Sequence, residues 1–387
     1  MELEEAKARV QEEVDRRADL LLEVSHRIHG HPELLFDETF AADLLASALG
    51  TEAGAYGLDT AFESRYGDGS GPNVAVICEY DALPGIGHGC GHNVIAAAGL
   101  GAGLAAASVV DEAGGRLVVL GTPAEEGGGG KVLMGDRGAF EAVDAALMVH
   151  PAGADLTEPD VIAIATWKVE YFGRGAHAAA APHHGRNALD AMVLGYNAVA
   201  ALRQHIAWTD RIHGVFHKAG EKPNIVPDHT EAEWYVRSAT IDTLQPLKAR
   251  VLACLEAGAA AAGCRMEVSP TSPEYSDLRT NPALIDLYRT NSATVGRQVA
   301  DPSAANRVVA STDMGNVSHL VPSIHPMIAV APPDVPLHSA EFARWAASED
   351  GDKAVLDGAK AMAMTVVDLW LAPGAVEEVR ATFGSGP

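Results

Sequence analysis

The residues with the clearest chemical potential lie in a glycine-rich segment, Gly87 to Asn93 (GHGCGHN). Its glycines allow tight turns, so the thiolate of Cys90 and the imidazole of His92 can reach one ion without side-chain crowding. Cysteine and histidine are preferred ligands of zinc-like ions. Taken alone, the segment could equally be a buried free cysteine beside a glycine turn.

A second segment, Pro123 to Gly130 (PAEEGGGG), carries the adjacent carboxylates of Glu125 and Glu126. Adjacent side chains point in different directions, so one carboxylate can bind a metal ion while the other takes a proton from water. A glutamate pair on its own is usually solvated surface. Its position after a predicted strand and beside a glycine run favours a functional interpretation.

Two histidines extend the set. His150 stands at the end of a predicted strand at 145–149, and His338 lies far along the chain in Val335 to Ser339 (VPLHS). A lone histidine is more often structural than a ligand, so the prediction depends on the ensemble. Most of these residues come directly after a predicted strand, where functional loops gather in open α/β sheets.

The elements that must position these residues alternate between strand and helix. Short apolar runs predict buried strands at 73–79, 116–121 and 145–149. Helices are predicted at 3–29, 38–49, 94–107 and 131–140. This alternation predicts an α/β fold with a mostly parallel sheet covered on both faces. The apolar run at 94–110 is slightly short for a bilayer and lacks a basic flank, which favours a buried helix.

The middle of the chain follows another order. Its patterns predict a strand at 165–172, a helix at 187–206, strands at 212–219 and 230–237, a helix at 241–262 and a strand at 264–268. This β-α-β-β-α-β order is typical of a small self-contained α+β unit. Helices predicted at 282–295 and 352–371 resume the α/β pattern. We therefore predict a discontinuous catalytic domain, residues 1–164 and 276–387, with an inserted domain at 165–275.

Bulk properties agree with an enzyme that acts on small molecules. A chain of 387 residues exceeds one ordinary core, so two domains are expected. Its formal net charge of −24 disfavours a nucleic-acid partner. The N-terminus lacks the basic start and apolar stretch of a signal peptide. We expect a cytoplasmic protein without a membrane partner, in which Cys78, Cys90, Cys254 and Cys264 are reduced and Cys90 is free for a metal ion.

Taken together, these segments resemble the M20 metallopeptidase family, in its amidohydrolase and aminoacylase branch. The matching stretches follow the family's order, cover most of the chain and are specific as a set: His29 to Leu34 (HGHPEL), Glu79 to Pro84 (EYDALP), Gly87 to Asn93, Pro123 to Gly127, Gly175 to Ala178 (GAHA), Asn224 to Asp228 (NIVPD) and Pro336 to Ser339. Residues 79–93 and 311–316 resemble the aminoacyl-dipeptidase and aminobenzoyl-glutamate hydrolase members. Hippurate-type members usually carry aspartate at the position of Asn93.

The resemblance implies a metal centre with a separate proton acceptor. Two divalent metal ions would be held, with Cys90 as the bridge, by Cys90, His92, Glu126, His150 and His338. Asp81 would be a carboxylate that orients one of these ligands, and Glu125 would be the general base.

The resemblance also implies roles within the inserted domain. His177 corresponds to a histidine that reaches a catalytic site, often that of the partner subunit, to stabilise an oxyanion. Asn224 and Arg237 match positions that bind the carboxylate of the substrate, although Arg237 could equally be a strand arginine that faces solvent. The domain would act as a lid and as the contact of a homodimer.

The expected reaction is hydrolysis of an amide bond in a small N-acyl amino acid, a dipeptide or an aryl-amide of glutamate. Thiolate and imidazole ligands favour zinc, whereas a carboxylate-containing pair of sites also accepts manganese or cobalt.

Three alternative functions are less consistent with the sequence. A cysteine-nucleophile amidase using Cys90 and His92 leaves the other clusters unexplained. A non-catalytic protein that binds small peptides would have lost the base or a ligand. A structural zinc site would have ligands at short spacing.

Overall fold

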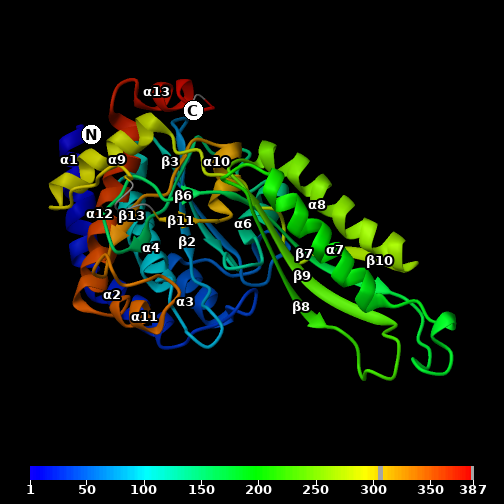
Figure 1. Ribbon diagram of the computed structural model, residues 1–387. Helices are drawn as coiled ribbons and strands as arrows, with labels where there is room; N and C mark the ends of the chain where they lie inside the picture. The colour runs from blue at the N-terminus through cyan, green and yellow to red at the C-terminus, as the bar shows by residue number, and fades with distance from the viewer. Residues whose placement is uncertain (304–307, 385–387) are drawn as a thin grey trace. The chain divides into compact units, whose positions relative to one another are not determined.

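The computed structural model describes residues 1–303 and 308–384 (Figure 1). Its contacts divide the chain into two compact units, one of Met1–Asp160 with Leu278–Pro387 and the other of Val161–Asp277. Among the helices in these described ranges, none has the length and apolar character needed to cross a membrane. The cytoplasmic location stays a prediction of the sequence.

The first unit is built on a five-stranded sheet in the order β1-β3-β2-β4-β12. Strands β3, β2, β4 and β12 pair in parallel, whereas β1 joins β3 antiparallel. The predicted α/β fold with a mostly parallel sheet is confirmed. The bounds are β1 (Phe62–Tyr66), β2 (Asn73–Glu79), β3 (Arg116–Thr122), β4 (Ala145–Leu147) and β12 (Ser323–Ile324).

Helices cover both faces of this sheet. Val74 and Val76 of β2 pack in one cluster with α4 and α12, while Ala75 and Ile77 pack in another with α6 and α10. Successive side chains of a strand point to opposite faces, so a strand buried on both is apolar throughout. The helices of the unit are α1 (Leu3–Arg16), α2 (Ala18–His29), α3 (Thr39–Leu49), α4 (His92–Ala107), α5 (Val110–Ala113), α6 (Gly130–Asp136), α9 (Pro282–Thr294), α10 (Met314–Leu320), α11 (Ala340–Trp345), α12 (Glu349–Leu371) and α13 (Ala375–Ala381).

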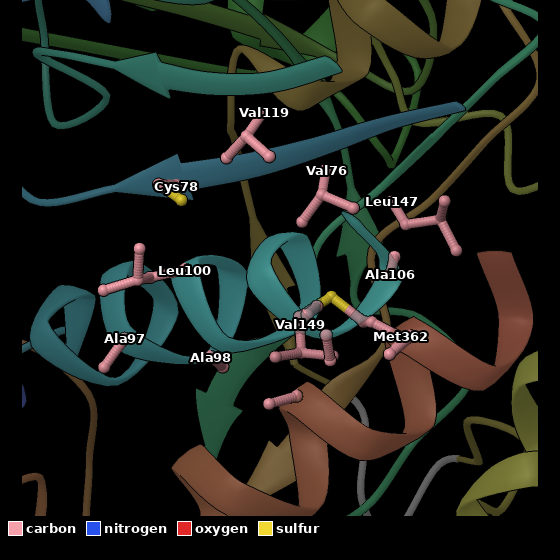
Figure 2. Packing of buried hydrophobic residues seen from close by; sticks show 14 of the residues in the cluster. Val76, Cys78, Ala97, Ala98, Leu100, Ala106, Val119, Leu147, Val149 and Met362 are labelled. Atoms are coloured by element: carbon pink, nitrogen blue, oxygen red, sulfur yellow. The ribbon is translucent and has the colours of Figure 1, made fainter. Parts of the chain in front are cut away.

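Helix α4 lies between the sheet and α12, as Figure 2 shows by the packing of Leu100 and Met362. A Cβ atom on Gly99 would lie 2.7 Å from the carbonyl oxygen of Ile77, and one on Gly103 would lie 2.5 Å from Val119. Small residues therefore let the helix pack directly on β2 and β3. This contact confirms the buried helix predicted for the apolar run and places its first residue, His92, near the end of β2.

Three predicted elements of this unit were wrong in extent. The helix predicted at 3–29 is interrupted at Arg17, whose φ of −99° and ψ of 6° are not helical, although no glycine or proline marks the break. The helix predicted at 131–140 ends at Asp136, before Gly138 with its φ of 89°. The strand predicted at 145–149 ends at Leu147.

His150 instead begins a separate strand, β5 (His150–Ala152), which pairs in parallel with β13 (Met327–Ala329). Strands of two to five residues, such as β1, β12 and β13, were not predicted because so short a run shows no periodicity. The remaining short elements are β6 (Asp160–Val161), β11 (Val309–Ala310), η1 (Ala55–Gly57), η2 (Pro182–His184) and η3 (Arg203–His205).

The second unit is a four-stranded antiparallel sheet in the order β10-β7-β9-β8 with two helices. Alternate residues of the strands, such as Val169, Tyr171 and Trp234, share one core with the two helices. Strand β8 is an edge of the sheet. The elements are β7 (Ala163–Phe172), α7 (Ala188–Leu202), β8 (Arg211–Lys218), β9 (His229–Ser238), α8 (Ile241–Ala262) and β10 (Arg265–Pro270). A role as lid or dimerisation domain stays a prediction.

Candidate metal centre

Two parallel strands deliver the acidic residues of the first unit to one edge. Strands β2 and β3 are in register, with Glu79 opposite Thr122 at their carboxyl ends. Asp81 follows β2 directly, and the Glu125–Glu126 pair follows β3. Because neighbouring parallel strands end at the same edge, their carboxylates lie close together.

The turn after β3 has an unusual backbone. Ala124 adopts a φ of 59°, which is uncommon for any residue other than glycine. Its N–H donates to Oε1 of the buried Glu38 at 2.8 Å, and its carbonyl oxygen accepts from Gly128 and Gly129. These bonds hold the conformation that presents Glu125 and its neighbour. No pattern in the sequence pointed to Glu38, which lies 86 residues away from the turn it supports.

The buried Glu38 makes stability depend on pH. Burial, together with the nearby charge of Asp81, raises the pKa of Glu38 from 4.5 to about 7. An acid whose pKa is raised by folding stabilises the protein fully below pH 4.5 and loses that contribution as pH rises through about 7. We expect the unfolding free energy of the metal-free protein to fall more steeply with rising pH in the wild type than in Glu38→Gln. Urea unfolding across this range measures both slopes, and equal slopes would contradict the prediction.

Cys90 and His92 flank Gly91 at the start of α4. Gly91 has a φ of 77°, and a Cβ atom there would lie 2.8 Å from Pro151. A larger residue would both strain the turn and displace the strand that carries His150. Glycine therefore allows the Cys90 loop and β5 to approach each other.

The five predicted ligands meet in two groups that share one thiol. Cys90, His92 and His150 form the first group, and Cys90, Glu126 and His338 form the second, with the ligand atoms of each within 4.8 Å of one another. The Cys90 Sγ atom lies 3.4 Å from His150 Nε2 and 3.5 Å from His338 Nε2. Glu126 Oε1 lies 3.6 Å from His338 Nε2. A thiolate in this position is within reach of two ions.

Fixed partners orient two of the imidazoles. His92 Nδ1 lies 3.1 Å from Asp81 Oδ1, and His150 Nδ1 lies 2.8 Å from the carbonyl oxygen of Pro151. Donation from each Nδ1 leaves the Nε2 lone pair for an ion. The other oxygen of Asp81 accepts the backbone N–H of Glu126 at 2.9 Å. Burial would raise the pKa of Asp81, but the His92 hydrogen bond and charge outweigh it and lower that pKa.

His338 is the open member of the set. Its side chain is 55% exposed, whereas that of Glu126 is 10% exposed. The backbone N–H of His338 donates to the carbonyl oxygen of Gly89 at 2.9 Å, which ties it to the Cys90 loop. The backbone at His338 has a φ of 59°. The second group of ligands therefore has access to solvent.

Buried negative charge is in excess at this centre. Burial raises the pKa of Glu126 and of the Cys90 thiol, and burial followed by the charge of Glu79 raises that of Glu125. Glu79 Oε1, His92 Nε2 and Glu126 Oε1 are buried without a hydrogen-bond partner in the described part of the chain. Buried charges are normally paired or coordinate metals. This donor set therefore fits divalent cations.

Four neighbouring residues were not singled out from the sequence. Lys131 is fully buried and donates through Nζ to Glu79 Oε2 and, at 2.7 Å, to Asp313 Oδ1. The ring of His325 stacks on that of His150, with centroids 5.2 Å apart. One usable signal was a glutamate as the last residue of an otherwise apolar strand, since an acid there must find a partner.

The three candidates of the second unit do not gather at one place. His177 and Ile225 form a β-bridge, and the carbonyl oxygen of Asn224 accepts from Ala178 at 3.0 Å, so His177 and Asn224 are exposed neighbours. Arg237 pairs with Arg211 at the other end of β9. Eight residues of strand separate it from His229, roughly 25 Å at the usual rise. Within one chain, Asn224 and Arg237 are too far apart to bind the same small carboxylate.

The tautomer of His177 follows from its hydrogen bonds. Its Nδ1 accepts from the backbone N–H groups of Ala179 and Ala180 at 3.3 and 3.1 Å. An accepting Nδ1 leaves the ring proton of the neutral imidazole on Nε2. The exposed Nε2–H is therefore a hydrogen-bond donor.

Comparison with known proteins gives consistent matches. The model of "Peptidase family M20/M25/M40" matches residues 75–366. The chain is 36% identical to the Xaa-Arg dipeptidase of Mus musculus over 99% of this chain and 93% of the relative. It is 29% identical to a p-aminobenzoyl-glutamate hydrolase protein of Escherichia coli (strain K12), over 92% and 90%. A solved dinuclear metal binding peptidase from the M20 family of Bacillus subtilis superposes with a TM-score of 0.62 at 18% identity, covering 88% and 98%.

Proposed function

Because the chain belongs to peptidase family M20/M25/M40 and is therefore an enzyme that hydrolyses C–N bonds, we propose that it cleaves the amide bond of a small substrate with a free carboxylate. Candidate substrates are dipeptides, aryl-amides of glutamate and N-acyl amino acids. The names of the relatives, an Xaa-Arg dipeptidase and a p-aminobenzoyl-glutamate hydrolase, support the first two classes.

The observation that carries this proposal is the Cys90 thiol shared by two ligand groups. We assign one divalent ion to Cys90, His92 and His150, and a second to Cys90, Glu126 and His338. The solved structural neighbour described as a dinuclear metal binding peptidase supports a pair of ions. Zinc is favoured by the thiolate and the imidazoles, with manganese or cobalt as alternatives.

Charge balance also supports two ions. The centre holds one buried lysine, Lys131, and five carboxylates that are fully or nearly buried: Glu79, Asp81, Glu125, Glu126 and Asp313. Five negative charges less one positive charge leave four, which two divalent cations neutralise. Uncompensated buried charge is costly, so the pair of ions would stabilise the folded centre.

When bound, the two ions would acidify a water molecule and polarise the carbonyl group of the substrate. Glu125 lies beside the proposed ligand Glu126, with Oε2 3.9 Å from His92 Nε2. We assign it the proton transfers: it accepts the proton of the attacking water and delivers it to the leaving amine. Asp81 holds the Nδ1 proton of His92 and so keeps the ligand in one tautomer.

The residues of the second unit would act from two copies of the chain. We propose a homodimer in which one copy supplies His177 and Asn224 to a centre, and the other supplies Glu125 and Arg237. The separation of Asn224 from Arg237 within one chain supports this division. The Nε2–H of His177 would donate to the substrate oxygen that gains negative charge.

An exposed apolar surface on the second unit supports pairing of two copies. Val193 and Leu194 of α7 and Val215 and Phe216 of β8 are all exposed. Strand β8 is also an edge, and edge strands offer unpaired backbone groups to a partner.

Mixing two inactive variants tests the shared centre. Glu125→Ala and His177→Ala are each expected to lose activity. After subunit exchange, mixed dimers would hold one complete centre each, so about a quarter of wild-type activity should return at equal amounts. Recovery is measured against each variant alone. Two variants that exchange subunits, as seen by native mass spectrometry, yet recover no activity would contradict the division.

The overall function is tested by a hydrolysis panel of dipeptides including Xaa-Arg, N-acyl amino acids and aminobenzoyl-glutamate. We expect at least one class to be cleaved, with activity lost on chelation and restored by zinc, manganese or cobalt. Activity that resists chelators but is lost on alkylation would favour a cysteine nucleophile instead. An absence of hydrolysis across the metal-replete panel would favour a binding protein.

A further inference from the structure

Two unpaired atoms face each other beside Cys90. Glu79 Oε1 lies 3.1 Å from His92 Nε2, and both side chains are 0% exposed. Neither atom has a hydrogen-bond partner within the described ranges. Donation from His92 Nδ1 to Asp81 leaves only a lone pair on Nε2. Two lone pairs at this distance repel each other in a buried site unless a cation lies between them.

The spacing matches that of two ligands on one ion. Nitrogen and oxygen ligands bind zinc at about 2.0–2.2 Å, so two of them at angles of roughly 90–110° lie about 3.0–3.5 Å apart. The Glu79–His92 distance of 3.1 Å falls in this interval. The ligand atoms of Glu79, His92 and Glu125 also lie within 4.8 Å of one another.

A buried ion pair fixes the orientation of the Glu79 carboxylate. Lys131 Nζ donates to its Oε2 atom and to Asp313 Oδ1. The second oxygen of Asp313 accepts the backbone N–H of Lys131 at 2.9 Å, which holds the pair in place. With Oε2 engaged, Oε1 points toward His92. Anchoring of this kind is what partners behind a metal ligand provide.

We propose that Glu79 is a further metal ligand, which through Oε1 joins Cys90, His92 and His150 as the fourth protein donor to one ion. This proposal rests on the two-ion function proposed above. Its consequence is that the two ions are unequal. The ion with four protein donors would be closed, whereas the ion of Cys90, Glu126 and His338 would keep an open position. Open positions are a property of catalytic rather than structural sites, so we assign substrate binding to the Glu126–His338 side.

Metal affinity of Glu79→Gln tests this assignment. Competition with a chromophoric chelator gives a dissociation constant for each ion. We expect the tighter constant to weaken by more than about a hundredfold, beyond the 10–100-fold cost of losing a partner behind a ligand. The other constant should change by only a few-fold. The absorption spectrum of the cobalt-loaded tight site should also change, because its coordination changes.

Asp368→Asn is the matched control. Asp368 is likewise a buried carboxylate paired with a lysine, Lys7 at 2.7 Å, but it belongs to neither ligand group. Its substitution should leave both constants and the cobalt spectrum unchanged. If the wild type binds two ions and Glu79→Gln keeps both constants and the spectrum, the assignment of Glu79 fails while the proposed function stands. A wild type that binds no ion would overturn both.

The wild-type protein itself provides a test that needs no variant. In a crystal structure with zinc, Glu79 Oε1 is expected at about 2.0–2.2 Å from the ion of Cys90, His92 and His150. Circular dichroism shows whether Glu79→Gln folds, and if it does not, this distance decides. A separation beyond about 3 Å with a water molecule between them would overturn the proposal.

Discussion

Glu125→Gln is expected to lower kcat by about 10²–10⁴-fold while both metal ions stay bound, since this is the usual contribution of a general base. The amide has nearly the shape of the carboxylate but cannot accept a proton at neutral pH. Glu125 stands outside both groups that share Cys90, so its loss leaves their ligand atoms in place. Steady-state kinetics with a cleaved substrate and metal analysis of the purified protein measure the two quantities.

Glu126→Gln is the matched control for this experiment. Glu126 is the adjacent residue on the same turn, and its Oε1 lies 3.6 Å from His338 Nε2. Its substitution should lower both the metal content and the activity, because it is a proposed ligand. Full activity in Glu125→Gln would contradict its role as the base. Loss of metal from Glu125→Gln would instead make it a ligand.

Cys90→Ala is expected to lose both ions, because its Sγ atom belongs to both ligand groups. Activity should fall to background. Thermal stability should also lose its dependence on added zinc, since an ion stabilises only a folded protein that binds it. Metal content per chain, activity and the melting temperature with and without zinc are the measurements.

His338→Ala provides the comparison for Cys90→Ala. His338 belongs to one group only and is largely exposed, so its variant should keep one ion per chain. Equal loss from both variants would contradict the bridging role of Cys90. A Cys90→Ala protein that keeps two ions but has no activity would favour a cysteine nucleophile, the alternative enzyme class that the Cys90 and His92 pair allows.

Much of the architecture could be predicted because it depends on local pattern. The run NVAVICE predicts a strand buried on both faces, and β2 is such a strand. Parallel strands end at one edge, so residues that follow β2 and β3 could be expected to be neighbours. Glycine-rich turns before α4 and α6 were visible in the same way. These features follow from backbone preference and side-chain period, which neighbouring residues set.

Contacts between distant segments could not be predicted, because no local pattern encodes them. Glu38 supports the turn at Ala124 from 86 residues away, and Lys131 meets Asp313 across 182 residues. Which acid a buried lysine pairs with depends on how the sheet and helices pack around it. The same reason applies to Arg237: its residue type suggested a carboxylate partner, but only the strand register shows that it lies far from Asn224.

The chemical groups available at the centre follow from the amino-acid sequence alone: a thiol, imidazoles and an adjacent pair of carboxylates, most of them placed directly after a predicted strand. Folding in three dimensions was needed to show that Cys90 is shared by two groups and that the unpaired oxygen of Glu79 faces His92. The physical reason is that ligand type is a property of a residue. Convergence of ligand atoms is a property of the packing that closes the chain over hundreds of residues.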